Sequence, residues 1–134
     1  MLNPSYRSRL ASLSKFALAL FWLALFAATH VPPTTGFLPP QGSDKFAHFA
    51  AYAMLALLFA TTWQLAAGVL TSRHLALVWL AVAFYGAFDE VTQILVGRYC
   101  NVGDWTADAL GAAAGLLLFV WLRRMMEQKV SPKE

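Results

Sequence analysis

The sequence predicts an all-α fold, a bundle of four transmembrane helices that forms an integral membrane protein. Of its 134 residues, 59% are hydrophobic and only 13% are charged, which lies outside the usual range for soluble domains. Four long apolar segments follow one another, and each has about the 20 residues that a helix needs to cross a bilayer. The basic residues lie mainly near the chain ends and form no patch interleaved with aromatic rings, which argues against a nucleic-acid partner.

The first helix is expected at about residues 13–31. Its apolar run lies between Lys15 and His30, and two prolines follow, which cannot continue a helix. Arg7 and Arg9 ahead of an apolar stretch are also typical of a cleaved signal peptide. We favour the interpretation that this segment is retained as the first helix.

The positions of the basic residues predict the topology of the remaining helices. These helices are expected at about residues 46–67, 75–96 and 105–122. Four spans place both termini on the same side of the membrane. Eight of the ten Lys and Arg residues fall on that side, and only Lys45 and Arg98 fall on the other. Because cytoplasmic loops carry the Lys and Arg excess, we predict a single domain over residues 1–134 in the cytoplasmic (inner) membrane, with both termini and a basic tail at 123–134 in the cytoplasm.

Most of the acidic residues are predicted to lie on the opposite, extracytoplasmic side. Five of the seven do so, namely Asp44, Asp89, Glu90, Asp104 and Asp108. Asp44, His48 and Tyr52 are one helical turn apart and share a face of the second helix. On the third helix, Asp89 or Glu90 has the same relation to Gln93. A charge within a membrane span is costly unless it is paired or hydrated, so such residues mark a polar interior or a functional site.

These groups occur at matching depth on three helices, which predicts a polar cavity in the outer leaflet. The residues predicted to line it and to bind a ligand are Asp44, Lys45, His48, Tyr52, Glu90, Gln93, Arg98, Asp104 and Asp108.

Each of these residues also has a purely structural interpretation. Ser43 or Asp44 is suited to capping the second helix and Asp104 the fourth, since Ser and Asp are favoured N-caps. Arg98 has the charge to neutralise Glu90 or Asp104 as a structural ion pair. His48 is compatible with a hydrogen-bonded core histidine. His30, His74 and Cys100 have no polar residues near them in the pattern and are assigned no role.

Small residues on the fourth helix predict a close helix contact. Gly111 and Gly115 form a GxxxG pattern on the face that also carries Asp104 and Asp108. The pattern is compatible with packing inside the bundle and with a homo-oligomer formed through this face.

The same residues resemble the signature of the VanZ-like family of small membrane proteins. The similarity covers about residues 44–118 and consists of Asp44-Lys45-x-x-His48-x-x-x-Tyr52, Glu90-x-x-Gln93, Arg98, and Asp104 leading into Gly111-x-x-x-Gly115. Asp108 departs from the family, which usually has Asn at that position. The resemblance implies a role in the cell envelope, with resistance to the glycopeptide teicoplanin in the founding member, but it implies no particular reaction.

Two functions are compatible with these residues. In the first, the cavity binds the polar part of a membrane lipid, a lipid-linked cell-wall precursor or a glycopeptide-related ligand, with Lys45 and Arg98 contacting phosphate or carboxylate. In the second, the chain is an intramembrane enzyme that acts on such a lipid or precursor, with Glu90 or Asp108 as general acid or base and His48 as proton carrier.

Two further alternatives have less support. His48, Asp44, Glu90 and Asp108 have the N and O ligands that a divalent ion accepts, but no strong metal-binding spacing is present, so we predict no metal and no cofactor. A proton- or ion-coupled transporter is also compatible with intramembrane carboxylates. Against it, nothing comparable lines the cytoplasmic half of the predicted bundle.

Overall fold

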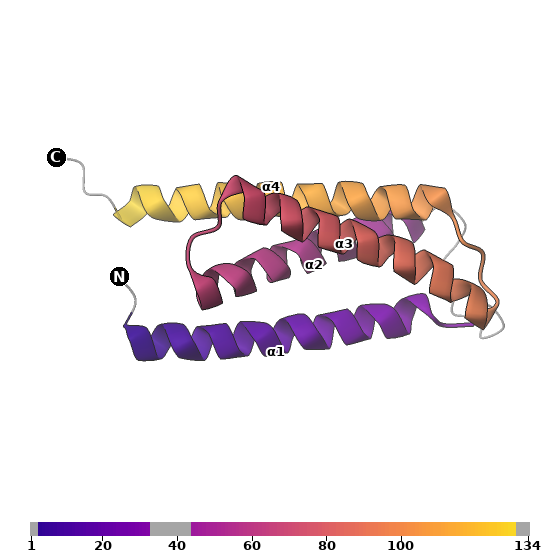
Figure 1. Ribbon diagram of the computed structural model, residues 1–134, viewed down its shortest axis with the longest axis horizontal. Coiled ribbons are helices and arrows are strands. Elements are labelled where there is room, and N and C mark those ends of the chain that lie inside the picture. The colour runs from indigo at the N-terminus through magenta and orange to yellow at the C-terminus, as the bar shows by residue number, and fades with distance from the viewer. Residues whose placement is uncertain (1–2, 33–43, 131–134) are drawn as a thin grey trace.

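The computed structural model describes residues 3–32 and 44–130 and consists of helices in these ranges (Figure 1). The elements are α1 (Pro4–Thr29), α2 (Asp44–Ala67), α3 (Ser72–Thr92), the short 3₁₀ helix η2 (Gln93–Val96) and α4 (Val102–Val130). The start of α1 and the end of α4 lie at the same end of the bundle (Figure 1). Each of the four α-helical spans is long and apolar enough to cross a membrane, so the predicted four-helix transmembrane fold is confirmed. The chain is a multi-pass membrane protein.

Two helix boundaries differ from the prediction. α1 begins at Pro4 rather than near residue 13, with Asn3 as its N-cap: the Asn3 Oδ1 accepts a hydrogen bond from the Ser5 N–H. α4 continues to Val130, so most of the predicted tail at 123–134 is helical, and 131–134 lie outside the described residues. Hydropathy detects only the part of a helix that is apolar, so it misses polar turns that extend beyond that part.

Apolar side chains cover the outside of the bundle, as expected for a protein with lipid as its solvent. Leu95, Leu117 and Phe84 are 85%, 72% and 77% exposed, respectively. Buried carboxyl groups, by contrast, occupy part of the interior. This distribution reverses that of a soluble protein and follows from the low cost of exposing apolar groups to lipid.

α2 and α4 form the closest contact of the bundle. A Cβ atom at Gly111 would collide with the backbone carbonyl of Phe49, and one at Gly115 would collide with that of Ala53. The two glycines therefore let the α2 and α4 backbones touch, as in small-xxx-small helix pairs. This face therefore packs against α2, and a homo-oligomer through it stays a prediction.

Two arginines form hydrogen bonds to backbone carbonyls at the end of the bundle where α1 begins. The Arg7 Nε donates to the carbonyl of Leu65 at 3.1 Å, near the end of α2. The Arg123 Nη1 donates to the carbonyl of Leu70 at 2.9 Å, in the connection to α3. Arg7 thus satisfies a carbonyl in the last turn of α2, which a helix end leaves without a partner, and Arg123 satisfies a carbonyl of the connection.

α3 begins with a reciprocal capping box in which His74 takes part. The His74 N–H donates to the Thr71 Oγ1, and the His74 Nδ1 accepts from the Thr71 N–H at 3.1 Å. His74, which the sequence pattern left without a role, therefore has a local structural one.

Candidate functional site

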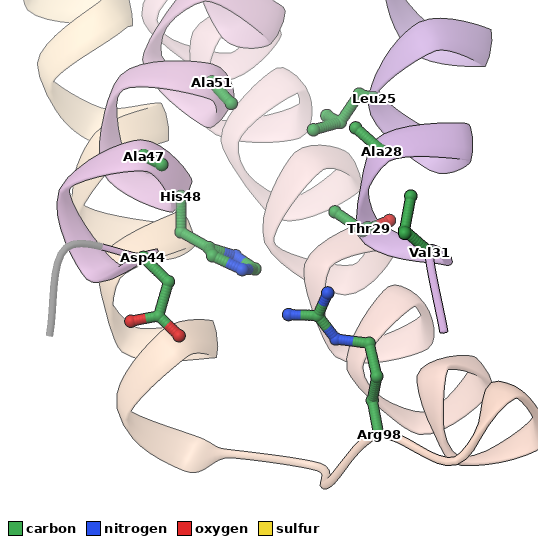
Figure 2. Close-up of a pocket in the computed structure, with 9 residues that line it drawn as sticks. All are labelled: Leu25, Ala28, Thr29, Val31, Asp44, Ala47, His48, Ala51 and Arg98. Atoms are coloured by element: carbon green, nitrogen blue, oxygen red, sulfur yellow. The ribbon is translucent and has the colours of Figure 1, made fainter. Parts of the chain in front are cut away.

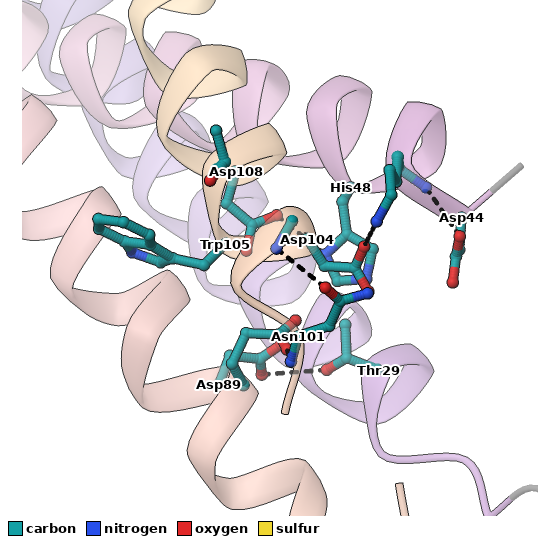
Figure 3. Close-up of polar contacts among 12 residues, drawn as sticks. Thr29, Asp44, His48, Asp89, Asn101, Asp104, Trp105 and Asp108 are labelled. Atoms are coloured by element: carbon teal, nitrogen blue, oxygen red, sulfur yellow. Dashed lines mark hydrogen bonds and ion pairs between the residues drawn. The ribbon is translucent and has the colours of Figure 1, made fainter. Parts of the chain in front are cut away.

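Polar side chains are concentrated at the other end of the bundle, where α1 ends, α2 begins, α3 continues into η2 and α4 begins (Figure 3). Seven of the eight buried polar residues of the described chain lie here: Thr29, His48, Asp89, Glu90, Gln93, Asp104 and Asp108. We call these seven residues the polar cluster. The cluster draws on all four α-helices and brings together residues up to about 80 positions apart in the chain.

His48 and Asp108 form a buried pair between α2 and α4. The His48 Nδ1 lies 2.9 Å from the Asp108 Oδ1, and the two side chains are 8% and 0% exposed. The other carboxylate oxygen, Asp108 Oδ2, and the Tyr52 hydroxyl are buried and have no hydrogen-bond partner among the described residues. Gly86 leaves room for both, since a Cβ atom there would lie 3.1 Å from Asp108 Oδ2 and 3.2 Å from Tyr52 Cε1.

The two neighbouring acids of α3 point toward different helices and share one amide. The Gln93 Nε2 donates to Asp89 Oδ2 at 3.1 Å and approaches Glu90 Oε1 at 3.5 Å. Glu90 Oε2 accepts a hydrogen bond of 2.7 Å from the backbone N–H of Asn101, just before α4. Glu90 is therefore fixed by the connection between η2 and α4.

Asp89 is bound to the end of α1, which the sequence pattern did not predict. The Thr29 Oγ1 donates to Asp89 Oδ1 at 3.0 Å. The adjacent His30 places its Nε2 3.0 Å from the Thr92 Oγ1 and its Nδ1 2.9 Å from the carbonyl of Phe26. His30 thus lies among polar groups, which corrects its assignment as a residue without a polar environment. The one-turn spacing of Asp89 and Gln93 was the available signal for Asp89, whereas no local pattern pointed to Thr29 or His30.

Asp104 pairs with a lysine rather than capping a helix. The Lys45 Nζ donates to Asp104 Oδ1 at 2.6 Å, with the lysine side chain half exposed. The cap of α4 is Asn101, whose Oδ1 accepts from the N–H of Gly103 at 2.9 Å. The interpretation of Asp104 as the N-cap of the fourth helix is therefore wrong. Asp44 is the first residue of α2, and its Oδ1 accepts from the Lys45 N–H at 3.0 Å.

A pocket of about 380 Å³ opens between α1 and α2 beside the polar cluster (Figure 2). It is lined by Leu25, Ala28, Thr29, Val31, Asp44, Ala47, His48, Ala51 and Arg98. The side chains of Arg98 and His48 extend toward each other across it, and Asp44 lies at its edge (Figure 2). One part of the wall is apolar and the other carries charged or titratable groups.

Arg98 is not paired with an acid in the described part of the chain. Its guanidinium has no hydrogen bond or ion pair within residues 3–32 and 44–130, so the structural pair with Glu90 or Asp104 that the sequence allowed is not formed. Of the nine residues predicted to line a cavity, Asp44, His48 and Arg98 do line the pocket. Tyr52, Gln93 and three of the acids are buried behind it, and Lys45 lies on the surface.

Three residues of the polar cluster have possible metal-ligand atoms that lie close to one another. His48, Glu90 and Asp108 each offer one ligand atom, and these atoms lie within 4.8 Å of one another. They come from α2, α3 and α4, and all three side chains are buried. Asp44, which the sequence analysis grouped with them, is not part of this set.

Comparison with known proteins gives one match. A family model described as VanZ/LLP1 matches residues 5–123, which is most of the chain and includes all four spans. No curated protein and no solved structure matches the chain.

Proposed function

The chain belongs to the VanZ/LLP1 family, and from this premise we propose that its pocket binds the anionic head of a membrane lipid or of a lipid-linked envelope precursor. The observation that carries the proposal is the Arg98 side chain, which reaches into the pocket without an acidic partner in the described residues. Lys45, the other cation at this end, is already paired with Asp104. A guanidinium binds phosphate or carboxylate through two parallel hydrogen bonds, so Arg98 is the natural anchor for an anion.

The shape of the pocket supports a ligand with a hydrocarbon chain. Leu25, Ala28, Ala47 and Ala51 line one part of the wall, whereas Arg98 and His48 line another. An amphipathic molecule would place its chain against the first part and its head against the second, and burial of the chain contributes free energy with each methylene.

The distribution of charge supports an extracytoplasmic position for this end. Arg7, Arg73, Arg123 and Arg124 belong to the opposite end of the helices, where the Lys and Arg excess of cytoplasmic loops is expected. With that orientation in the cytoplasmic membrane, the pocket would meet lipids and cell-wall precursors in the outer leaflet. This is the basis for proposing a role in the cell envelope and in tolerance to glycopeptide antibiotics.

The test is binding of defined lipids to the purified protein. In a non-ionic detergent, native mass spectrometry would compare phosphatidylglycerol with phosphatidylcholine of the same chains, and a polyprenyl phosphate would serve as the probe for a precursor. We expect the anionic lipids to bind more tightly than phosphatidylcholine. Arg98→Gln should lower the affinity for the anionic lipids about tenfold, since a charge-assisted contact is lost. Arg124→Gln, near the far end of α4, is the matched control and should bind as the wild type does. Equal binding by Arg98→Gln and the wild type would remove this role from Arg98.

An intramembrane reaction is the second candidate, and the His48–Asp108 pair favours it. A carboxylate at the Nδ1 of a histidine orients the ring and stabilises its protonated form, which suits a general base beside a ligand pocket. The experiment is incubation of the protein with each anionic lipid, with mass spectrometric detection of new products. A product formed by the wild type and absent with His48→Gln is expected for an enzyme, whereas an unchanged lipid in every sample would contradict it.

A further inference from the structure

We propose that His48, Glu90 and Asp108 bind a divalent transition-metal ion behind the wall of the pocket. Three helices converge to place one imidazole and two carboxylates together, with ligand atoms within 4.8 Å of one another. The site is independent of the lipid contact proposed for Arg98, because none of its three residues needs a lipid in order to bind an ion.

The charges of the three residues favour a divalent cation. Glu90 is 2% exposed and Asp108 is 0% exposed, and both lie within helices that span the membrane. Neither carboxylate contacts a lysine or an arginine in the part of the chain that the structure describes. Two buried carboxylates and a neutral imidazole carry two negative charges, which one divalent ion cancels.

Both carboxylates have an acceptor atom that the described residues do not fully use. Asp108 Oδ2 is buried without a hydrogen bond, although an ionised carboxylate oxygen normally has at least one donor. Glu90 Oε1 has only the long 3.5 Å contact to Gln93. Gly86 keeps the space beside Asp108 Oδ2 free of a side chain. Asp108 thus has an acceptor available that the folded chain does not satisfy.

The distances require little movement to hold an ion. Ligands that are about 2.0–2.2 Å from a zinc ion lie roughly 3–3.5 Å from one another. The His48 Nδ1 and Asp108 Oδ1 are already 2.9 Å apart, and an ion between them would take the place of the proton on Nδ1, with the neutral imidazole then carrying its proton on Nε2. Glu90 offers its ligand atom within 4.8 Å of the other two, so it has to move closer to complete the set.

Contacts around the ligands hold them in place. The Asn101 N–H donates to Glu90 Oε2 at 2.7 Å, which fixes that carboxylate and leaves Oε1 toward the cluster. Outer hydrogen bonds of this kind orient metal ligands and raise metal affinity. With three protein ligands, at least one coordination position remains, and His48 borders the pocket from which water or a ligand would fill it.

The ligand set selects the class of ion. Imidazole suits zinc and other transition ions, whereas magnesium and calcium prefer sites built from oxygen alone. We therefore expect Zn²⁺ and Mn²⁺ to bind more tightly than Mg²⁺.

The test is metal binding by the full chain in a non-ionic detergent free of phospholipid. All variants carry Cys100→Ser in addition, because an exposed thiol such as that of Cys100 is able to bind zinc. After chelation and gel filtration, Zn²⁺, Mn²⁺ and Mg²⁺ are titrated separately, and bound metal is measured by elemental analysis. We expect one Zn²⁺ per chain, with affinity reduced at least tenfold in His48→Gln, Glu90→Gln and Asp108→Asn. His74→Gln and Glu127→Gln are the controls for a histidine and an acid outside the site, and each should retain wild-type binding.

Two results would overturn the site: a wild-type chain that retains no Zn²⁺, or ligand variants that bind it as tightly as the wild type does. The Co²⁺ absorption spectrum of the wild type gives an answer even if a variant does not fold, since a spectrum identical to that of aqueous Co²⁺ also excludes the site. Arg98→Gln separates the two proposals: it should keep full metal binding while its affinity for anionic lipid falls about tenfold.

Discussion

The Thr29 Oγ1 donates a 3.0 Å hydrogen bond to Asp89 Oδ1, and this bond joins α1 to α3 across 60 positions of sequence. Asp89 is fully buried; the amide of Gln93 also donates to it, and the His30 Nδ1 lies 3.7 Å from its Oδ1. The hydroxyl of Thr29 therefore supports a carboxyl group that has no access to water.

Replacement of Thr29 by valine should destabilise the bundle. Thr29→Val keeps the shape of the side chain but removes the donor to Asp89, and bonds of this kind inside membranes contribute about 1 kcal/mol. The free energy of unfolding in detergent is the measurement. Thr106→Val is the control, because Thr106 is exposed and bonds only within α4. Equal stability of the two variants would show that the bond to Asp89 contributes nothing.

Enlargement of the glycines on α4 should separate it from α2. Gly111→Ala and Gly115→Ala place a methyl group against the carbonyls of Phe49 and Ala53, so the backbones must move apart, at a cost of about 1–3 kcal/mol each. Thermal unfolding in detergent checks this. Leu117→Ala, on the exposed face of the same helix, should change stability much less. An unchanged melting temperature for both glycine variants would mean that the contact is looser than described.

Two tryptophans should contribute to the contact between α3 and α4 in a reciprocal way. The Trp105 Nε1 donates to the carbonyl of Ala83 and the Trp79 Nε1 to that of Ala109, each at 3.0 Å. Trp105→Phe and Trp79→Phe should each lower the free energy of unfolding by about 1 kcal/mol. Trp121→Phe is the control, since the Trp121 indole has no hydrogen bond within the described ranges. A loss as large in that control would assign the effect to ring volume.

The proposed orientation predicts which cysteines react from outside the cell. In the Cys100→Ser background, Arg98→Cys should react with a membrane-impermeant thiol reagent in intact cells, and His48→Cys should react more slowly from its position in the pocket. Arg73→Cys and Arg124→Cys should react only after permeabilisation, because they belong to the opposite end. The reverse pattern would invert the topology.

The fold is predictable from sequence because lipid imposes a simple requirement. A segment that crosses the bilayer must be long, apolar and helical, and the four such segments are visible in the order of residues. The prediction left out the first turns of α1 because they contain Arg7 and other polar residues, which hydropathy does not detect. Such residues form a helix as readily outside the bilayer as inside it.

The site is only partly predictable, because its contacts join distant segments. Asp89 and Glu90 point about 100° apart on a helix, and Gln93 is one turn from both, so spacing alone could not choose between the two acids. The structure uses both, since α1 lies beside Asp89 and the start of α4 lies beside Glu90. His30 was missed because its partner Thr92 is 62 positions away and no local pattern records that contact.

The backbone contact between α2 and α4 makes this pair of helices more rigid than its contact with α1. α2 and α4 touch at Gly111 and Gly115 and should move as one rigid unit. Sliding of one helix along the other would bring a carbonyl of α2 into collision with α4. In the described residues α1 has no backbone contact of this kind; it is held to α3 at one end by the Thr29 bond and to α2 at the other end by Arg7. The pocket lies between α1 and α2, so one of its walls belongs to a helix fixed by backbone contact and the other to a helix fixed by side-chain hydrogen bonds at its two ends.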